Sequence, residues 1–105
     1  MWNESVASFE RATRLDPAHM RAWSNLAVAY ETLGRLDDGE RAARQAIHLS
    51  DGTHFRAWYN LATVQQKQGR DREACASLDR ALAINPEYLK AEREAVAHCG
   101  RRPRR

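Results

Sequence analysis

The feature of this sequence that most constrains its fold is a phrase that occurs twice. The string RAWSNLAVAYETLGR at residues 21–35 returns as RAWYNLATVQQKQGR at residues 56–70, a spacing of 35 residues. A second pair of strings, SFERATRLDP at 8–17 and SLDRALAINP at 77–86, is separated by 69 residues, which is 34 plus 35. A fixed period of this length predicts an array of stacked structural units.

Each repeated unit has the pattern of two helices separated by a glycine. In the first helix, hydrophobic residues recur at i, i+3, i+4 and i+7 and form one apolar stripe: Trp23, Leu26, Ala27 and Tyr30. Gly34 follows as the expected C-terminal cap, and Asp37 or Asp38 is expected to serve the start of the next helix. That second helix carries its own stripe of Ala43, Ala46, Ile47 and Leu49.

These residues resemble the tetratricopeptide repeat family, whose 34-residue unit has the pattern W-x2-L-G-x2-Y, then glycine, then A-x3-F-x2-A-x4-P. The resemblance covers nearly the whole chain and implies an all-α fold, a right-handed α-α superhelical solenoid of about six helices. It divides the chain into five parts: the second helix of a partial repeat at 1–17, repeats at 20–51 and 55–86, a final or capping helix at 88–99, and a basic disordered tail at 101–105.

Three departures from the family pattern lie in the middle of the chain. Gly39 occupies a position where the family has alanine, at a cost of about 0.5–1 kcal/mol of helix stability. Gln65 replaces the family tyrosine, and the junction LSDGTH makes this unit one residue longer than 34. We expect these departures to loosen the second helix of the first repeat and the turn after it.

The N-terminal string corresponds only to the second helix of a repeat, with Trp2 at a position where the family has tyrosine. A lone second helix would expose the face that its partner should cover. We therefore expect either a fragment of a longer array, which is the favoured interpretation, or a chain whose exposed end pairs with another copy.

The positive charge of the chain belongs to its tail. The net charge is +3, but four of the 17 basic residues lie in GRRPRR at the C-terminus, and without them 13 basic residues face 14 acidic ones. Nucleic-acid binding is therefore the less favoured function, limited to unspecific, salt-sensitive contact through the tail arginines. No apolar run approaches the roughly 18 residues of a membrane helix, and no secretory segment is evident, so we expect a cytoplasmic protein without membrane contact.

Catalysis, metals and cofactors are not indicated. Cys75 and Cys99 lack zinc-type spacing, and we expect them to be reduced, structural thiols. No glycine-rich phosphate loop is present. The histidines fall at or near expected helix ends without an evident nucleophilic partner: His19, His48, His54 and His98. The sequence therefore predicts a protein that is not an enzyme, with no catalytic residues, no metal ligands and no cofactor.

The resemblance implies that the first helices of successive repeats line a concave groove. Residues on these helices that are not needed for packing form the predicted binding set: Arg21, Asn25, Val28, Arg56, Tyr59, Asn60, Thr63, Lys90 and Arg93. Arg21, Arg56 and Lys90 recur at steps of 35 and 34, which would place positive charge along one edge of the groove. The alternative is a solvated face with local ion pairs.

The two asparagines are unusual because asparagine is a poor residue for a helix interior. An amide offers donors and an acceptor, so Asn25 and Asn60 could hold the main chain of an extended peptide. In peptide-binding relatives an asparagine at this position does so, whereas in others it fixes local geometry between repeats. Both interpretations stay open from the sequence.

Some relatives bind chaperone C-termini through a five-residue carboxylate clamp. Only Asn60 and Lys90 match it here, since Ser24, Val28 and Glu94 occupy the other positions. We therefore expect a protein-interaction scaffold whose groove binds an extended, acidic segment of a partner protein, with a C-terminal carboxylate as a possible feature of the ligand. The alternative is self-association into a homo-oligomer through the array ends.

Overall fold

The computed structural model describes residues 2–102, of which Trp2 is described by its backbone alone. This part of the chain contains six α-helices and no strand, so the predicted all-α fold is confirmed. The helices are α1 (Trp2–Leu15), α2 (Met20–Thr32), α3 (Leu36–Leu49), α4 (Phe55–Lys67), α5 (Asp71–Ile84) and α6 (Leu89–His98).

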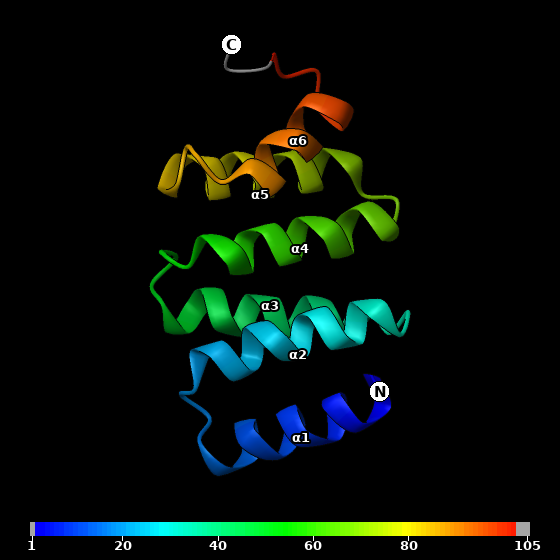
Figure 1. Ribbon diagram of the computed structural model, residues 1–105, viewed down its shortest axis with the longest axis vertical. Coiled ribbons are helices and arrows are strands. Elements are labelled where there is room, and N and C mark those ends of the chain that lie inside the picture. Colours follow the sequence, from blue (N-terminus) through cyan, green and yellow to red (C-terminus); the bar gives the residue numbers. More distant parts are fainter. Residues whose placement is uncertain (1, 103–105) are drawn as a thin grey trace.

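The helices form antiparallel pairs that stack along the longest of three dimensions, 43 × 26 × 20 Å (Figure 1). The chain pairs α2 with α3 and α4 with α5, while α1 and α6 lie at the two ends of the stack. α2 also contacts α4, which brings the first helices of the two pairs side by side. The structure is thus a helical solenoid. Within the described residues, no helix combines the length and the hydropathy that crossing a membrane requires.

The core is built from leucines and small residues at the predicted stripe positions. Leu26 and Leu61 are 2% and 1% exposed, and they occupy equivalent positions in α2 and α4. The alanines of the core are almost completely buried: Ala27, Ala43, Ala46, Ala62, Ala74 and Ala81. Small side chains let neighbouring helices approach closely, which explains why the repeat keeps alanine at these positions.

Gly34 ends α2 as predicted, because a residue with positive φ is needed there. Its φ is 78°, and the Arg35 amide after it donates to the Tyr30 carbonyl at 2.9 Å. Gly69 repeats this cap after α4 with φ of 77°. Asp37 and Asp38 lie in the first turn of α3, so the expectation that they serve the start of this helix is confirmed; Arg35, and neither aspartate, occupies the cap position, without a side-chain cap bond.

The recurring tryptophans do more than fill the core. The Trp23 indole Nε1 donates to the Pro17 carbonyl at 2.9 Å, and the Trp58 indole donates to the Gly52 carbonyl at the same distance. Each bond joins the first helix of a repeat to the turn that leads into it. The indole therefore fixes the angle between consecutive units, which an equally apolar phenylalanine could not do.

The expected loosening at Gly39 stays a prediction, and the structure shows that the missing side chain allows close packing there. α3 runs unbroken from Leu36 to Leu49, and Gly39 is buried. A Cβ atom added there would lie 3.2 Å from Val64 Cγ2 and 3.4 Å from the Ala27 carbonyl oxygen. Glycine has a low helix propensity, but at this position it allows α3 to pack closely against α2 and α4.

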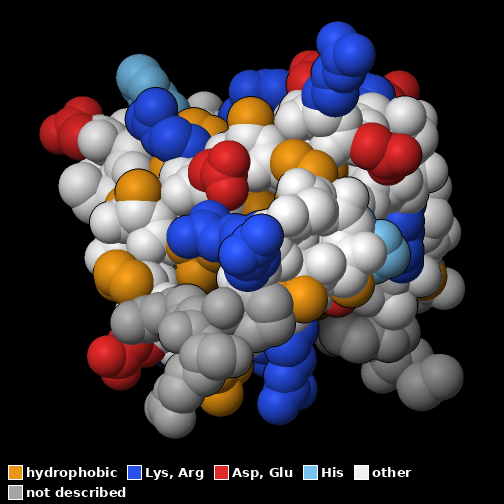
Figure 2. Space-filling view, turned by 90° about the horizontal axis from the view of Figure 1, so that it is seen from above, with side chains coloured by type: hydrophobic (Ala, Val, Ile, Leu, Met, Phe, Trp, Pro, Cys, Tyr) orange, Lys and Arg blue, Asp and Glu red, His pale blue; other side chains and the backbone are white. Residues whose placement is uncertain are grey.

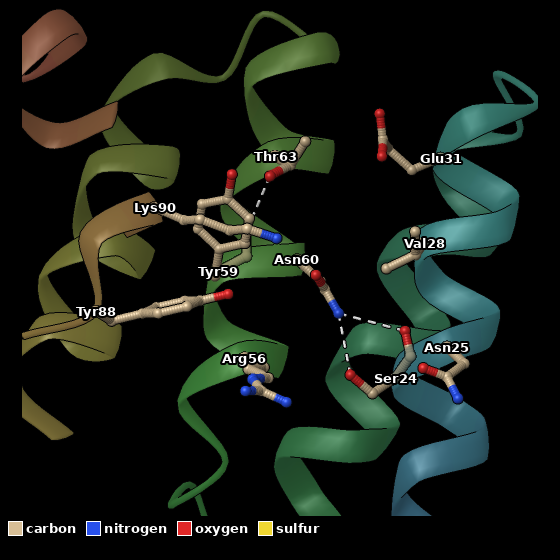
Figure 3. A pocket seen from close by; sticks show the side chains of 10 residues that line it. All are labelled: Ser24, Asn25, Val28, Glu31, Arg56, Tyr59, Asn60, Thr63, Tyr88 and Lys90. Carbon is tan, nitrogen blue, oxygen red and sulfur yellow. Dashed lines mark hydrogen bonds between the residues drawn. The ribbon is translucent and has the colours of Figure 1, made fainter. Parts of the chain in front are cut away.

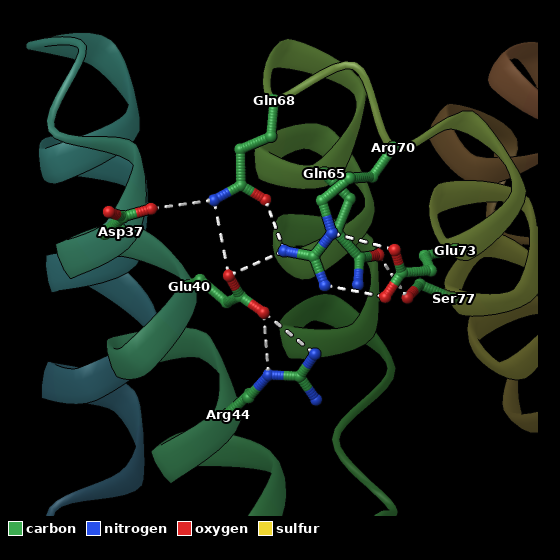
Figure 4. A network of polar contacts seen from close by, with 8 residues as sticks. All are labelled: Asp37, Glu40, Arg44, Gln65, Gln68, Arg70, Glu73 and Ser77. Carbon is green, nitrogen blue, oxygen red and sulfur yellow. Dashed lines mark hydrogen bonds and ion pairs between the residues drawn. The ribbon is translucent and has the colours of Figure 1, made fainter.

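A polar network among α3, the end of α4 and α5 connects the two complete repeats (Figure 4). Arg70 donates to Glu40 at 2.8 Å and to Glu73, which joins the turn after α4 to helices α3 and α5. Burial alone would raise the pKa of Glu40, but hydrogen bonds from Arg70, Arg44 and Gln68 lower it below its usual value. In the same region Ser77 donates to buried Gln65 at 2.7 Å, which satisfies the amide that replaces the family tyrosine.

The prediction of reduced thiols is wrong. Cys75 in α5 and Cys99 at the end of α6 form a disulfide, with their Cα atoms 5.7 Å apart. The antiparallel packing of α6 against α5 brings two residues separated by 24 positions within the distance that a disulfide requires. No local spacing motif accompanies such a pair, so the sequence alone did not reveal it.

Candidate peptide-binding groove

A hollow with a volume of about 530 Å³ lies between the first helices of the array (Figure 3). It is lined from α2, from α4 and from the start of α6, three segments that the superhelical stacking places in a row. The lining residues are Ser24, Asn25, Val28 and Glu31; Arg56, Tyr59, Asn60 and Thr63; and Tyr88 and Lys90.

The structure brings seven of the nine predicted residues together around this hollow: Asn25, Val28, Arg56, Tyr59, Asn60, Thr63 and Lys90. Arg21 is exposed on α2 but does not line it. Arg93 lines a separate hollow on α6, together with Leu89, Glu92, Val96 and Ala97. The hollow therefore contains seven residues of the predicted set and leaves out Arg21 and Arg93.

Tyr88 lines the hollow although the sequence interpretation did not select it. It occupies the N-cap position of α6, and His19 and His54 occupy the same position in α2 and α4. The three residues recur at steps of 35 and 34. This periodicity identifies Tyr88 as a groove position, although Tyr88 lies just before its helix and not inside it.

The two repeated asparagines have different environments. Asn60 Nδ2 donates to the carbonyl oxygen of Ser24 at 3.3 Å and to its Oγ at 3.0 Å, so Asn60 connects α4 to α2. Asn25 is exposed, points away from Asn60 in Figure 3, and makes no hydrogen bond through its side chain within the described part of the chain. One copy therefore holds neighbouring repeats together while the other offers its amide to solvent.

Two tyrosine rings, those of Tyr59 and Tyr88, line one side of the hollow, and Phe55 packs against Tyr88. The Tyr88 ring packs edge-to-face against Phe55 and Tyr59, with centroid distances of 4.9 and 5.5 Å. Burial, followed by the negative charge of Glu94, raises the pKa of Tyr59, and burial also raises that of Tyr88. Both phenols are therefore neutral at physiological pH and can donate hydrogen bonds.

The charges around the hollow leave a positive edge. Glu31 forms an ion pair with Lys67, whereas Arg56 and Lys90 are exposed. Burial, together with the charges of Arg56 and Arg21, lowers the pKa of His54, the N-cap residue of α4. Burial is the largest cause of this shift, and the two arginine charges add to it, which is consistent with a positive edge.

The side chains around the hollow include cations, phenols and amides, which can make hydrogen bonds to a ligand. The described residues contain no group of three or more histidine, cysteine or acidic side chains that could hold a metal ion. Such an arrangement can hold a peptide main chain and acidic side chains through hydrogen bonds.

The end of the array at α6 has a different surface. Figure 2, seen from this end, shows Lys and Arg side chains among scattered hydrophobic ones. Leu89 is 60% exposed here, beside the apolar hollow on α6. At the start of the predicted tail, Arg101 donates to Asp79 at 3.0 Å, and residues 103–105 lie outside the described residues.

Stacked antiparallel helix pairs define a helical repeat protein. Residues 2–54 match one tetratricopeptide repeat model and residues 55–88 match another. The chain therefore belongs to the tetratricopeptide repeat family, as its sequence resemblance indicated. Domains of this family are protein–protein interaction modules and are typically not enzymes.

Solved structures of the family superpose closely on this chain. The tetratricopeptide domain of OM64 from Arabidopsis gives a TM-score of 0.89 at 23% identity, covering 94% of this chain and 81% of that one. The first such domain of Spaghetti (RPAP3), solved with the HSP90 peptide SRMEEVD, gives 0.88 at 19% identity, covering 94% and 78%. The MamA protein gives 0.84 at 22% identity, covering 95% of this chain and 55% of MamA. A comparison with proteins of curated function found no match.

Proposed function

We propose that the chain is a scaffold that binds an extended, acidic peptide segment of a partner protein in the groove between α2, α4 and α6. One observation carries the proposal: predicted residues from three successive first helices line a single hollow whose unpaired charges are positive. Arg56 and Lys90 attract acidic side chains, and the free amide of Asn25 holds the main chain of the ligand.

A charged peptide series tests this function. Fluorescein-labelled hexaglutamate, with hexalysine as the control probe, is titrated with the full chain and followed by fluorescence anisotropy. Hexaglutamate binds, and Arg56→Gln combined with Lys90→Gln weakens it about tenfold, because each exposed charge pair contributes up to about 1 kcal/mol. Arg72→Gln on α5 is the matched control, since Arg72 is exposed and lies outside the groove. Equal affinity of wild type, the double variant and Arg72→Gln for hexaglutamate contradicts the proposal.

The asparagines define a second test of the same groove. Asn25→Ala weakens hexaglutamate binding without changing helicity, because the exposed amide is available to the ligand. Asn60→Ala weakens binding less, since the Asn60 amide already bonds to Ser24. An unchanged affinity of Asn25→Ala rules out the main-chain contact.

The C-terminal peptide SRMEEVD, seen with the Spaghetti domain, serves as a specificity probe. We expect weak binding of it, no stronger than that of its amidated form, because only Asn60 and Lys90 match the clamp positions. Stronger binding of the free acid would identify a C-terminal carboxylate as the preferred ligand.

Self-association is the second candidate function, and the apolar hollow on α6 supports it. Leu89 and Val96 line this hollow, and Leu89 is largely exposed. If copies assemble there, light scattering shows a mass that rises with concentration, and Leu89→Glu abolishes the rise. A constant monomer mass at high concentration removes this candidate.

We also propose a cytoplasmic location, which affects the redox state of the two disulfide-bonded cysteines. Reducing compartments keep most thiols reduced, whereas stable disulfides belong to oxidising ones. In a reducing cytoplasm we therefore expect Cys75 and Cys99 to be mainly reduced and to form the disulfide only transiently.

A further inference from the structure

The last helix of the array, α6, has few contacts that hold it in place. Of its residues, only Ala91 and Ala95 are buried, whereas α2 and α4 bury six and five residues that include leucines. Alanine contributes little apolar area. A ten-residue helix also has almost no stability of its own, since isolated helices shorter than about 12–15 residues are marginal in water.

Apart from the packing of Ala95 and the weak contact of Cys75 Sγ with the His98 carbonyl, two contacts hold the C-terminal end of α6. The first is the exposed ion pair between Arg101 and Asp79, and pairs of this kind contribute little. The second is the disulfide between Cys99, at the C-cap of α6, and Cys75 in α5. The covalent bond is therefore the principal restraint on this end of the helix.

The other end of α6 belongs to the groove. Tyr88 at its N-cap and Lys90 in its first turn line the hollow, and the Tyr88 ring packs against Phe55 and Tyr59. Lys90 contributes one of the two cations of the positive edge. Any loss of order in α6 therefore removes one wall and half of the charge of the proposed binding surface.

The disulfide is accessible to small thiols. Cys75 and Cys99 are both only partly buried. A polar hollow of about 240 Å³ is lined by Cys75 together with Gln66, Asp71 and His98. A reductant can thus reach a sulfur without unfolding of the array.

From these observations we infer that the Cys75–Cys99 disulfide is a redox-controlled positioning element that holds α6 in place and thereby completes the binding groove. The inference rests on the proposed function of that groove. A dithiol reductant breaks the S–S bond by transferring two electrons and two protons, so that both cysteines become thiols and the dithiol becomes a cyclic disulfide. α6 then frays from its C-terminal end, and the competent groove is populated for only part of the time.

Two measurements on the full chain, before and after reduction with dithiothreitol, test the inference. Hydrogen–deuterium exchange of residues 89–98 accelerates on reduction, while residues 20–32 of α2 serve as the internal control. The dissociation constant of fluorescein–hexaglutamate rises about fivefold, because apparent affinity falls with the fraction of competent protein. Reoxidation restores both values.

The double variant Cys75→Ser with Cys99→Ser gives the matched control. It behaves like the reduced wild type in both measurements and does not respond to dithiothreitol, whereas a response of this variant overturns the inference. If it does not fold, the reversible change in wild-type protein still decides the question.

The remaining outcomes separate this inference from the proposed function. Unchanged hydrogen exchange of α6 on reduction overturns the inference. Faster exchange of α6 with an unchanged affinity for hexaglutamate also overturns it, but leaves the proposed peptide binding supported. If the oxidised protein binds no hexaglutamate, the proposed function fails, while the exchange of α6 still shows whether the disulfide holds the helix.

Discussion

Helices α2 and α4 begin with nearly the same seven residues, yet the fold uses their polar residues differently. Leu26 and Leu61 are buried alike, and each tryptophan holds the turn before its helix. Asn60 reaches back to α2, whereas Asn25 makes no such contact. The comparison teaches that apolar positions of a repeat are equivalent wherever a unit lies in the stack, while a polar position depends on the neighbour that its place provides.

The largest expected effects test the equivalence of the buried leucines. Leu26→Ala and Leu61→Ala should each lower the free energy of unfolding by about 3 kcal/mol, because each leaves a cavity in a closely packed core. Urea titration followed by circular dichroism measures both, with Leu15→Ala, where Leu15 is 78% exposed, as the control. A loss below about 1 kcal/mol at either leucine contradicts the equivalence.

Tyr30 and Gln65 occupy equivalent positions but have different partners. The Tyr30 hydroxyl donates to Glu10 in α1, whereas Gln65 accepts from Ser77 in α5. Tyr30→Phe should lower the free energy of unfolding by about 2 kcal/mol, as is usual for a hydrogen bond to a charged group, here a partly buried one. Chemical denaturation near neutral pH measures this loss, and an unchanged midpoint excludes the bond.

The same contact predicts a pH dependence. Burial first, and then the hydrogen bond to Glu10, raises the pKa of Tyr30 from 10.0 to about 12. The folded state therefore retains its proton longer than the unfolded state, so this stabilisation is complete below pH 10 and disappears as the pH rises towards about 12. The difference in stability between wild type and Tyr30→Phe should shrink over that range, and a constant difference contradicts the assignment.

The two indole bonds differ in exposure and should differ in strength. Trp58→Phe should lower the free energy of unfolding by about 1 kcal/mol beyond the effect of the smaller ring, because the change also removes the partly buried hydrogen bond to Gly52. Trp23→Phe should cost less, since its bond to Pro17 is exposed. Thermal unfolding of the two variants compares them directly, and the reverse order would show that exposure does not set the strength of this bond.

The smallest effects distinguish the asparagines by sign. Asn25→Ala should stabilise the chain by about 0.5 kcal/mol, because alanine is the better helix former and no bond is lost. Asn60→Ala gains the same propensity but loses the bond to Ser24, so a net loss of about 0.5 kcal/mol is expected. Equal effects of the two changes would show that the Ser24 contact contributes nothing.

Most of the architecture followed from the sequence. The period of 34 to 35 residues, the stripe from Trp23 to Tyr30 and the glycines at 34 and 69 predicted the helices and their stacking, because they reflect local rules that each unit obeys by itself. The candidate groove followed in outline for the same reason. Seven of its residues were found from their helical positions, whereas Tyr88 was missed because it lies before its helix.

The sequence by itself determined which residues pack, since burial on a helix face repeats with the unit. Only the tertiary structure decided which polar groups find partners. The Asn60 bond to Ser24, the close approach at Gly39 and the Cys75–Cys99 disulfide each join segments that are distant along the chain. Their formation depends on how neighbouring helices cross, and no local pattern of residues specifies that geometry.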